Sequence, residues 1–168
     1  MKSFHRVMVA TDLTPTSGPA FRAAVELAEG GAELMIVHAY QPPTVNQIDP
    51  IGSVVYGQWD ASLRAAAEQR LQSLVEGARR AGVDARALLL SGPPSEAITQ
   101  AAEDNRADVL VLGTHGSKGI RRFFLGSVAS RVISMAPCPV MTIRPGLRSQ
   151  TSSTKDKMHA IRGTSVSS

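Results

Sequence analysis

The sequence predicts an α/β fold in which one parallel sheet is covered by helices on both faces. Short apolar runs, typical of buried strands, alternate along the chain with segments whose apolar residues repeat at helical spacing. Strands that alternate with helices in this way form parallel sheets, and right-handed crossovers connect them. Aromatic residues are only 4% of the 168 residues, so the core is built from aliphatic side chains.

The first third of the chain predicts two strands and one helix. Val7-Met-Val-Ala10 and Leu34-Met-Ile-Val37 are continuous apolar runs, as expected for strands buried on both faces. Between them, Pro19 suits a first helical turn, and apolar residues recur at helical spacing as far as Ala28. Gly30-Gly31 then ends the helix.

Residues 41–58 show no clear period and contain three prolines and two glycines. Such a long connection favours a lid, an interface element or local disorder. Tyr40, Tyr56 and Trp59 lie in or beside it; they could cover a ligand, but aromatic residues in such a place more often anchor a loop to its own domain. Apolar residues at helical spacing then predict a helix over residues 63–78.

The second half of the chain predicts three further strands, each preceded by a helix. The strands are expected at residues 85–90, 109–112 and 139–143. Gly92-Pro-Pro-Ser95-Glu96 opens a third helix, and a fourth is expected over residues 127–135. No internal repeat is visible, so one domain is expected.

Charge is distributed unevenly along the chain. The formal net charge is +4, and residues 146–168 hold four basic residues against one acidic residue, which leaves +1 for residues 1–145. This near-neutral body argues against a nucleic-acid partner. We expect a nucleotide-binding domain at residues 1–145 and a flexible, basic, Ser/Thr-rich tail at residues 146–168, although the tail could instead touch an acidic partner.

The chain shows no targeting or redox motif. No apolar run approaches the ~20 residues of a membrane span, and the N-terminus lacks a signal-peptide core, so we expect a cytoplasmic protein with no membrane partner. The single cysteine, Cys138, excludes an internal disulfide and a Cys-based zinc site. Its place between Pro137 and Pro139 favours a buried structural thiol over a reactive one.

A glycine-rich stretch predicts a phosphate-binding site. Gly113 ends an apolar strand, where a ribose or phosphate could lie against bare backbone, and Gly116 can adopt a positive φ in the following turn. His115 could bind a phosphate or be a turn residue facing water. The basic loop that follows could neutralise phosphate charge or simply be solvated; its cations are Lys118, Arg121 and Arg122.

The second part of this stretch opens the last predicted helix. Gly126 and Ser127 come directly before Val128 and Ala129, whose N–H groups lie in the first turn and have no partner within the helix. The dipole of the helix favours an anion there by roughly 0.3–1 kcal/mol. The hydroxyl of Ser127 could bind a phosphate oxygen or cap its own helix.

Ligands of parallel sheets bind at the carboxyl ends of the strands, where the strand order reverses. The ends available here are Thr11-Asp12, His38-Ala39 and Gly113-Thr114. Asp12 could hold a nucleotide-bound Mg²⁺, bind the base or sugar, or be a turn residue whose side chain caps the chain. Ala39 combines a small side chain with a free main chain, which suits the edge of an adenine. P-loop, dinucleotide and nucleophile-elbow motifs are absent from the sequence.

The spacing Gly113-x2-Gly116-x9-Gly126-Ser127 resembles the nucleotide-binding signature of the universal stress protein family, in its ATP-binding branch. The opening Val-Ala-Thr-Asp12 resembles the first strand and turn of that family. The resemblance covers about residues 4–145. Further matching motifs are Val37-His-Ala, Gly92-x-Pro-x-x-Glu96, Ala107-Asp-Val-Leu-Val-Leu-Gly113 and Cys138-Pro-Val.

The resemblance implies a doubly wound, Rossmann-like sheet of five parallel strands in the order 3-2-1-4-5, with ATP and Mg²⁺ across the ends of strands one, two and four. It implies a homodimer in which residues 139–144 pair with their copy across a two-fold axis, as an apolar edge strand would favour. The implied ligand-binding residues are Ala10, Thr11 and Asp12 at the adenosine or metal, Ala39 at the adenine, Gly113 at the ribose, and Thr114, His115, Gly116, Gly126, Ser127, Val128 and Ala129 toward the phosphates.

Three functions follow from these observations. The favoured one is a regulatory protein of the stress response, whose dimer surface or protein partner changes with bound ATP. The second is a slow ATPase or phosphoryl-transfer enzyme, for which the sequence supplies no obvious base and no assignable arginine finger. The third is a dimerisation module that binds no nucleotide.

Overall fold

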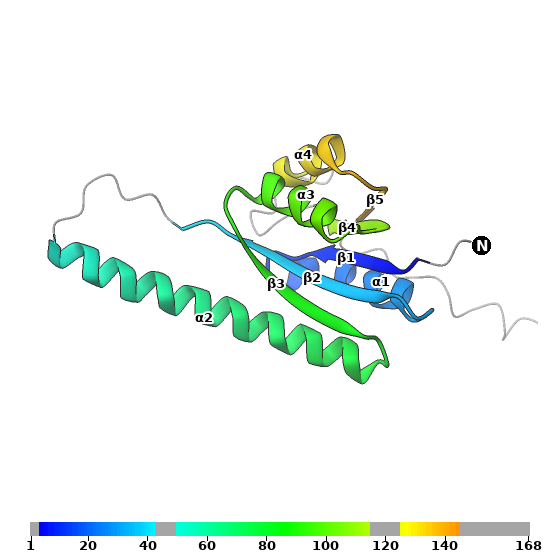
Figure 1. Cartoon of the computed structure of the whole chain (residues 1–168), viewed down its shortest axis with the longest axis horizontal. Coiled ribbons are helices and arrows are strands. Elements are labelled where there is room, and N and C mark those ends of the chain that lie inside the picture. The colour runs from blue at the N-terminus through cyan, green and yellow to red at the C-terminus, as the bar shows by residue number, and fades with distance from the viewer. Residues whose placement is uncertain (1–3, 43–49, 115–124, 145–168) are drawn as a thin grey trace, which may run out of the picture.

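Five parallel strands form one sheet in the order β3-β2-β1-β4-β5 (Figure 1), as the resemblance implied. The computed structural model describes residues 4–42, 50–114 and 125–144. In the centre of the sheet, Val9 lies opposite Ile36 of one neighbouring strand and Val111 of the other. The strands are β1 (Arg6–Ala10), β2 (Glu33–Tyr40), β3 (Ala85–Ser91), β4 (Val109–Gly113) and β5 (Val140–Ile143).

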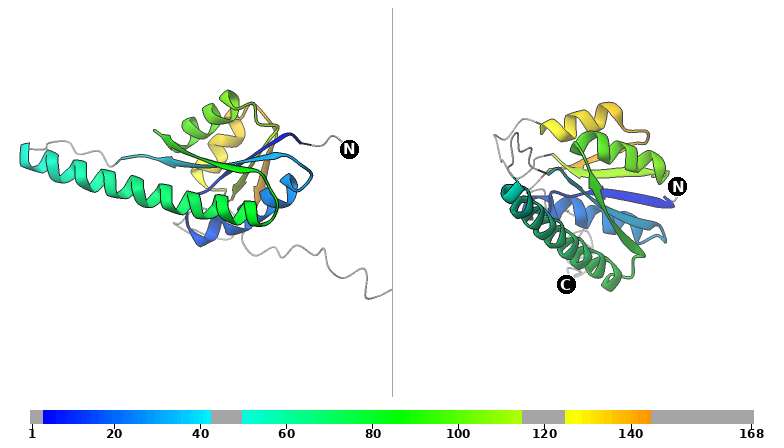
Figure 2. Two further views of the ribbon diagram at one scale, coloured as in Figure 1. Left: turned by 60° about the horizontal axis from the view of Figure 1, so that its bottom comes forward. Right: turned by 60° about the vertical axis from the view of Figure 1, so that its left-hand side comes forward.

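Helices cover both faces of this sheet, α1 and α2 on one side and α3 and α4 on the other (Figures 1 and 2). The helices are α1 (Gly18–Ala28), α2 (Pro50–Arg80), α3 (Pro94–Asp104) and α4 (Ser127–Met135). A short 3-10 turn, Pro15–Ser17, leads into α1. Gly31, with φ of +95°, follows α1 in the left-handed region, so the predicted glycine stop is confirmed.

Successive side chains of the inner strands enter opposite halves of the core. Val7 and Val9 of β1 pack with α1 and α2, whereas Met8 and Ala10 pack with α3 and α4. Val7, Val9 and Met8 are fully buried, and burying each such side chain stabilises the fold by about 1.5–3 kcal/mol. The unbroken apolar runs of the sequence therefore correspond to strands with two buried faces.

Helix α2 is longer than the sequence predicts. It begins at Pro50 rather than near residue 63, so the prediction of an irregular segment over 41–58 is wrong for residues 50–58. The N-terminal end of α2 extends beyond the sheet (Figure 1). Trp59 is 48% exposed in this part of the helix.

Two further predictions concern the C-terminal tail and membrane-spanning helices. The predicted tail, residues 146–168, lies outside the described residues. Among the residues that the structure describes, no helix is both long enough and apolar enough to cross a membrane.

Candidate nucleotide-binding site

The carboxyl ends of β1, β2 and β4 bring the predicted strand-end residues to one edge of the sheet. Ala10, the last residue of β1, lies opposite Val37 of β2 and Leu112 of β4. The residues that follow these three positions are therefore neighbours. They are Thr11-Asp12, His38-Ala39 and Gly113-Thr114. The order of the strands reverses between β1 and β4, so this edge is the switch point at which such sheets bind ligands.

The turn after β1 is held in a strained conformation by buried hydroxyls. Leu13 has φ of +59°, a left-handed conformation that costs a non-glycine residue roughly 1–2 kcal/mol. Its N–H donates to Thr11 Oγ1 at 3.0 Å, and that hydroxyl also shares a hydrogen bond of 2.8 Å with Ser17 Oγ. The main-chain N–H of Thr11 donates to Val37 O at 2.9 Å. These bonds fix the position of the residue between them, Asp12.

The two carboxylate oxygens of Asp12 have different surroundings. Oδ1 accepts hydrogen bonds from Thr14 N at 3.0 Å and Thr14 Oγ1 at 2.7 Å, which supports the turn-capping alternative. Oδ2 is buried and has no hydrogen-bond partner among the described residues. Because a buried polar atom without a partner costs about 1–3 kcal/mol, Oδ2 is the atom that a ligand or metal would satisfy.

Sequence reasoning missed the role of His38 at the end of β2. Its Nδ1–H donates to Thr11 O at 2.8 Å, so it joins the ends of β1 and β2 beside Asp12. The only signal in the sequence is its place next to Ala39, because its partner lies 27 residues away. Ala39 itself is half-buried, as an adenine-contacting position requires.

The end of β2 also anchors helix α2. Tyr40 Oη donates to Asp60 Oδ1 at 2.7 Å, and Arg64 Nε donates to Asp60 Oδ2 at 3.0 Å. The Arg64 guanidinium lies 5.1 Å from the centre of the Tyr40 ring, a cation–π arrangement. The bond to Asp60 raises the pKa of Tyr40 to about 12, and the same bond lowers the pKa of Asp60. Tyr40 therefore anchors the helix, while Tyr56 and Trp59 contact each other edge-on at 6.2 Å.

The two ends of the glycine-rich stretch are joined directly. Gly126 N–H donates to Thr114 O at 2.8 Å, and Thr114 N–H donates to Ile143 O of β5 at 3.0 Å. The start of α4 is thereby tied to the end of β4. Gly126 has φ of −60°, and Gly113 is not among the residues with positive φ. These two positions therefore do not use the positive φ that glycine allows.

The N-cap of α4 is Gly126, so Ser127 is the first helical residue and the alternative of Ser127 as a cap is not supported. Ser127 and Val128 are exposed, but the side chain of Ala129 is buried in the core. Ala129 can contribute only its main-chain N–H to a ligand. His115, Gly116 and the cations Lys118, Arg121 and Arg122 lie outside the described residues.

The described residues contain no group of three or more side chains that could hold a metal ion. At this edge, Asp12 offers one carboxylate oxygen, Oδ2, that has no partner in the described part of the chain. Cys138 lies away from this edge, half-buried against the core of α3 and α4, and burial raises the pKa of its thiol. That environment agrees with the structural role expected for it.

The fold and this edge define a doubly wound α/β protein of the kind that binds small ligands at a switch point. The chain belongs to the universal stress protein family, whose model matches residues 3–144. A universal stress protein encoded beside a QAH/OAS sulfhydrylase gene in Thermus aquaticus is 39% identical over 145 residues, which is 84% of this chain and 99% of the relative.

Two solved structures of the family contain an adenine nucleotide. One is a universal stress protein in complex with cAMP, at 26% identity and a TM-score of 0.64, covering 85% of this chain and 98% of that one. The other is a universal stress protein from Archaeoglobus fulgidus in complex with dAMP, at 25% identity and a TM-score of 0.59, covering 84% and 99%.

Proposed function

We propose that this chain binds ATP with Mg²⁺ at the carboxyl edge of its sheet and acts as a dimeric regulatory protein whose state the nucleotide sets. The observation that carries the proposal is the buried, unpartnered Oδ2 of Asp12 at the switch point. The binding domain would be residues 1–145, in the cytoplasm, and the tail at 146–168 would lie outside the site.

In this proposal, each part of the ligand contacts a different part of the carboxyl edge. The main chain around Ala39 would hold the adenine edge, and Gly113 would leave room for the ribose. Asp12 would supply an oxygen to the metal or to a ribose hydroxyl. The phosphates would lie before α4, where the first-turn amides of Ser127, Val128 and Ala129 have no helical acceptor. The amide of Gly126 is already occupied by Thr114 O.

The relatives with cAMP and dAMP support adenine recognition, and the first-turn amides of α4, which have no acceptor within the helix, extend the proposal to a triphosphate. Each added phosphate brings further negative charge to the helix dipole. The proposed site therefore ranks ATP above AMP, and AMP above adenosine.

Calorimetry with ATP, AMP and adenosine tests this ranking on the wild-type protein and on Gly126→Val. The valine side chain would occupy the phosphate position, so ATP affinity should fall at least about tenfold while adenosine affinity stays within about twofold. Gly30→Val is the matched control, because a Cβ at Gly30 meets nothing within 4 Å and its φ is not positive.

Undiminished ATP binding by Gly126→Val would contradict the placement of the phosphates. No binding of any adenine compound by the wild-type protein would leave the dimerisation module as the function. Release of inorganic phosphate over more than one turnover would identify the protein as an ATPase instead.

The proposed dimer uses β5, the last strand of the sheet, whose outer edge has no partner strand among the described residues. Met141 is 37% exposed on this strand, and the neighbouring α4 carries Ile133 and Met135, which are 45% and 49% exposed. An edge strand with exposed apolar side chains is a site for pairing with a second copy. The proposal therefore keeps residues 139–144 as the interface.

A further inference from the structure

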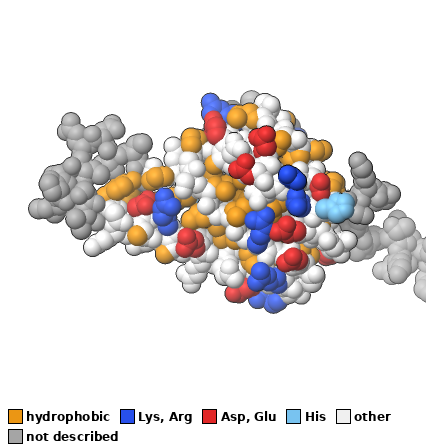
Figure 3. All heavy atoms as spheres, in the orientation of Figure 1, with side chains coloured by type: hydrophobic (Ala, Val, Ile, Leu, Met, Phe, Trp, Pro, Cys, Tyr) orange, Lys and Arg blue, Asp and Glu red, His pale blue; other side chains and the backbone are white. Residues whose placement is uncertain are grey.

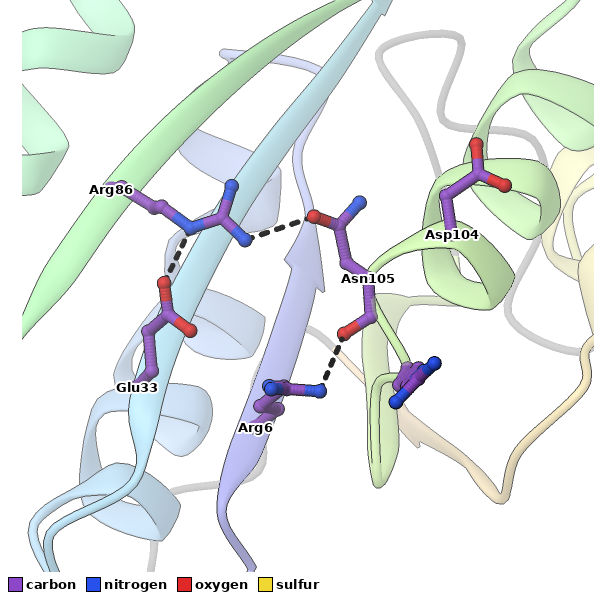
Figure 4. A pocket seen from close by; sticks show the side chains of 6 residues that line it. Arg6, Glu33, Arg86, Asp104 and Asn105 are labelled. Carbon is purple, nitrogen blue, oxygen red and sulfur yellow. Dashed lines mark hydrogen bonds and ion pairs between the residues drawn. The ribbon is translucent and has the colours of Figure 1, made fainter.

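A second candidate site lies at the opposite end of the strands from the proposed nucleotide site. A cavity of about 320 Å³ opens there, where β1, β2 and β3 begin and α3 ends (Figure 4). Its lining residues are Arg6, Glu33, Arg86, Asp104, Asn105 and Arg106. Basic and acidic side chains gather on this face of the molecule (Figure 3). Four residue steps of β1, or roughly 13 Å, separate Arg6 from Ala10 at the other edge.

One wall of the cavity is fixed by internal bonds. Arg86 Nε forms an ion pair with Glu33, and Arg86 Nη2 donates to Asn105 Oδ1 at 2.9 Å (Figure 4). Asn105 is itself held by a bond of 2.7 Å from its Nδ2 to Ala101 O. The negative charge of Glu33 is therefore balanced by Arg86, and the guanidinium is held in place.

The other two guanidiniums form no ion pair within the described part of the chain. The pKa of Asp108 is lowered mainly by main-chain hydrogen bonds from His5 and Arg6, and the charge of Arg6 contributes to that shift. Arg6 Nη1 donates only a long bond of 3.4 Å to the neutral carbonyl of Asn105. The side chain of Arg106 forms no hydrogen bond or ion pair within the described part of the chain. Of the nearby carboxylates, Asp104 lines the cavity and its Oδ1 accepts from Gln100, whereas Asp108 Oδ2 accepts from the main-chain N–H groups of His5 and Arg6. Each guanidinium carries five N–H donors, so most donors at this cavity remain available.

The backbone at Arg106 is unusual for an arginine. Arg106 N–H donates to Glu103 O and Ala107 N–H donates to Ala102 O, both at 2.9 Å, which is the Schellman motif that ends α3. Arg106 occupies its left-handed position with φ of +49°, where glycine is the usual residue and a side chain costs roughly 1–2 kcal/mol. A strained residue that brings an unpaired cation to a cavity points to a function beyond stability.

The last carbonyl groups of α3 carry partial negative charge beside the cavity. Arg6 and Arg86 both donate hydrogen bonds to Asn105 there. That contact accounts for two of the three arginine side chains, whereas the side chain of Arg106 has no partner within the described part of the chain. We propose that this cavity binds a small polyanion bearing phosphate or carboxylate groups, held by Arg6 and Arg106 with Arg86 as the fixed third cation. Planar guanidiniums bind both kinds of group in a bidentate manner.

Amide-resolved NMR titration tests the proposal with two probes, inorganic pyrophosphate and citrate. We expect at least one of them to shift the main-chain amides of residues 104–107 with a dissociation constant of about 1 mM or tighter. Pyrophosphate alone would identify a phosphate ligand, and citrate alone a carboxylate. Two substitutions each remove one guanidinium from the cavity. They are Arg106→Gly, which fits the left-handed backbone, and Arg6→Gln. Each should weaken binding about tenfold, whereas Arg70→Gln, the same charge change on the exposed face of α2, should leave it unchanged.

The absence of shifts at residues 104–107 with both probes would overturn the proposal, as would equal weakening by Arg70→Gln. Shifts from pyrophosphate at residues 126–129 alone, with no shift from citrate at residues 104–107, would overturn this proposal and would support the nucleotide site. Failure of the polyanion proposal can therefore be distinguished from failure of the nucleotide proposal.

Discussion

The main-chain N–H of Gly126 donates a hydrogen bond of 2.8 Å to the carbonyl oxygen of Thr114. This bond joins the start of α4 to the end of β4, although eleven residues separate the two in the sequence. It fixes where the free amides of the first turn of α4 lie relative to the sheet. The proposed phosphate position depends on that relationship, which can be tested apart from nucleotide binding.

Two substitutions of Gly126 separate its N–H from its small size. Gly126 has φ of −60°, which proline adopts readily, so Gly126→Pro removes the hydrogen bond without forcing the backbone. We expect its free energy of unfolding in urea to fall by about 1 kcal/mol. Gly126→Ala keeps the N–H and should stay within about 0.5 kcal/mol of the wild type. Equal stability of the two variants would contradict a contribution from the Thr114 bond.

Asp12→Asn changes the unpartnered oxygen and preserves the turn. Asparagine retains an Oδ1 acceptor for Thr14, so the variant should fold, but it replaces the oxygen offered to a metal with an NH₂ group. We expect Mg²⁺ to strengthen ATP binding in the wild type and to have at most a third of that effect in Asp12→Asn, by calorimetry with and without Mg²⁺. Asp84→Asn, an exposed carboxylate at the other edge, is the control. The same Mg²⁺ effect in all three proteins would exclude Asp12 from the metal.

The bond between Tyr40 and Asp60 predicts a high-pH transition. Asp60 raises the pKa of Tyr40 in the folded protein from 10.0 to about 12. The folded state thus holds the phenolic proton more tightly than the unfolded state, so the stabilisation is complete below about pH 10 and is lost as the pH rises through about 12.

Ultraviolet titration of tyrosinate measures this shift in a Tyr56→Phe background, where Tyr40 is the one remaining tyrosine. Asp60→Asn in the same background should return the pKa of Tyr40 toward 10.0, because the charged acceptor is gone. An unchanged titration would mean that Asp60 does not anchor Tyr40 in solution.

The proposed dimer predicts that a charge on β5 separates the subunits. Met141→Lys places a cation on the outer strand, where it would meet its own copy across the two-fold axis. Leu63→Lys is the matched control, since Leu63 and Met141 are each 37% exposed. Light scattering after size exclusion should give a monomer for Met141→Lys and a dimer for the wild type and the control. A dimer in all three proteins would place the interface elsewhere.

The sheet was predictable because its strands are buried on both faces. Val7 to Ala10 and Leu34 to Val37 form unbroken apolar runs, and these runs lie within β1 and β2, respectively. Residues 50–58 of α2 were missed because they include Gly52 and Gly57, which are typical of turns.

The site was predictable only in outline. Strand ends and glycines indicated the edge at which these residues meet, because parallel strands bring their carboxyl ends together. The contact of His38 with Thr11 and the left-handed backbones of Leu13 and Arg106 depend on tertiary structure and leave no local pattern. A glycine at position 106 would have indicated the end of α3, but the sequence has arginine there.

A crystal structure of the protein grown with excess ATP and Mg²⁺ tests the central claim most directly. The account predicts a nucleotide at the carboxyl edge, with its adenine beside Ala39, its phosphates before Ser127 and a partner for Asp12 Oδ2. An empty carboxyl edge with Asp12 Oδ2 still unpartnered, or ATP bound elsewhere on the molecule, would contradict it.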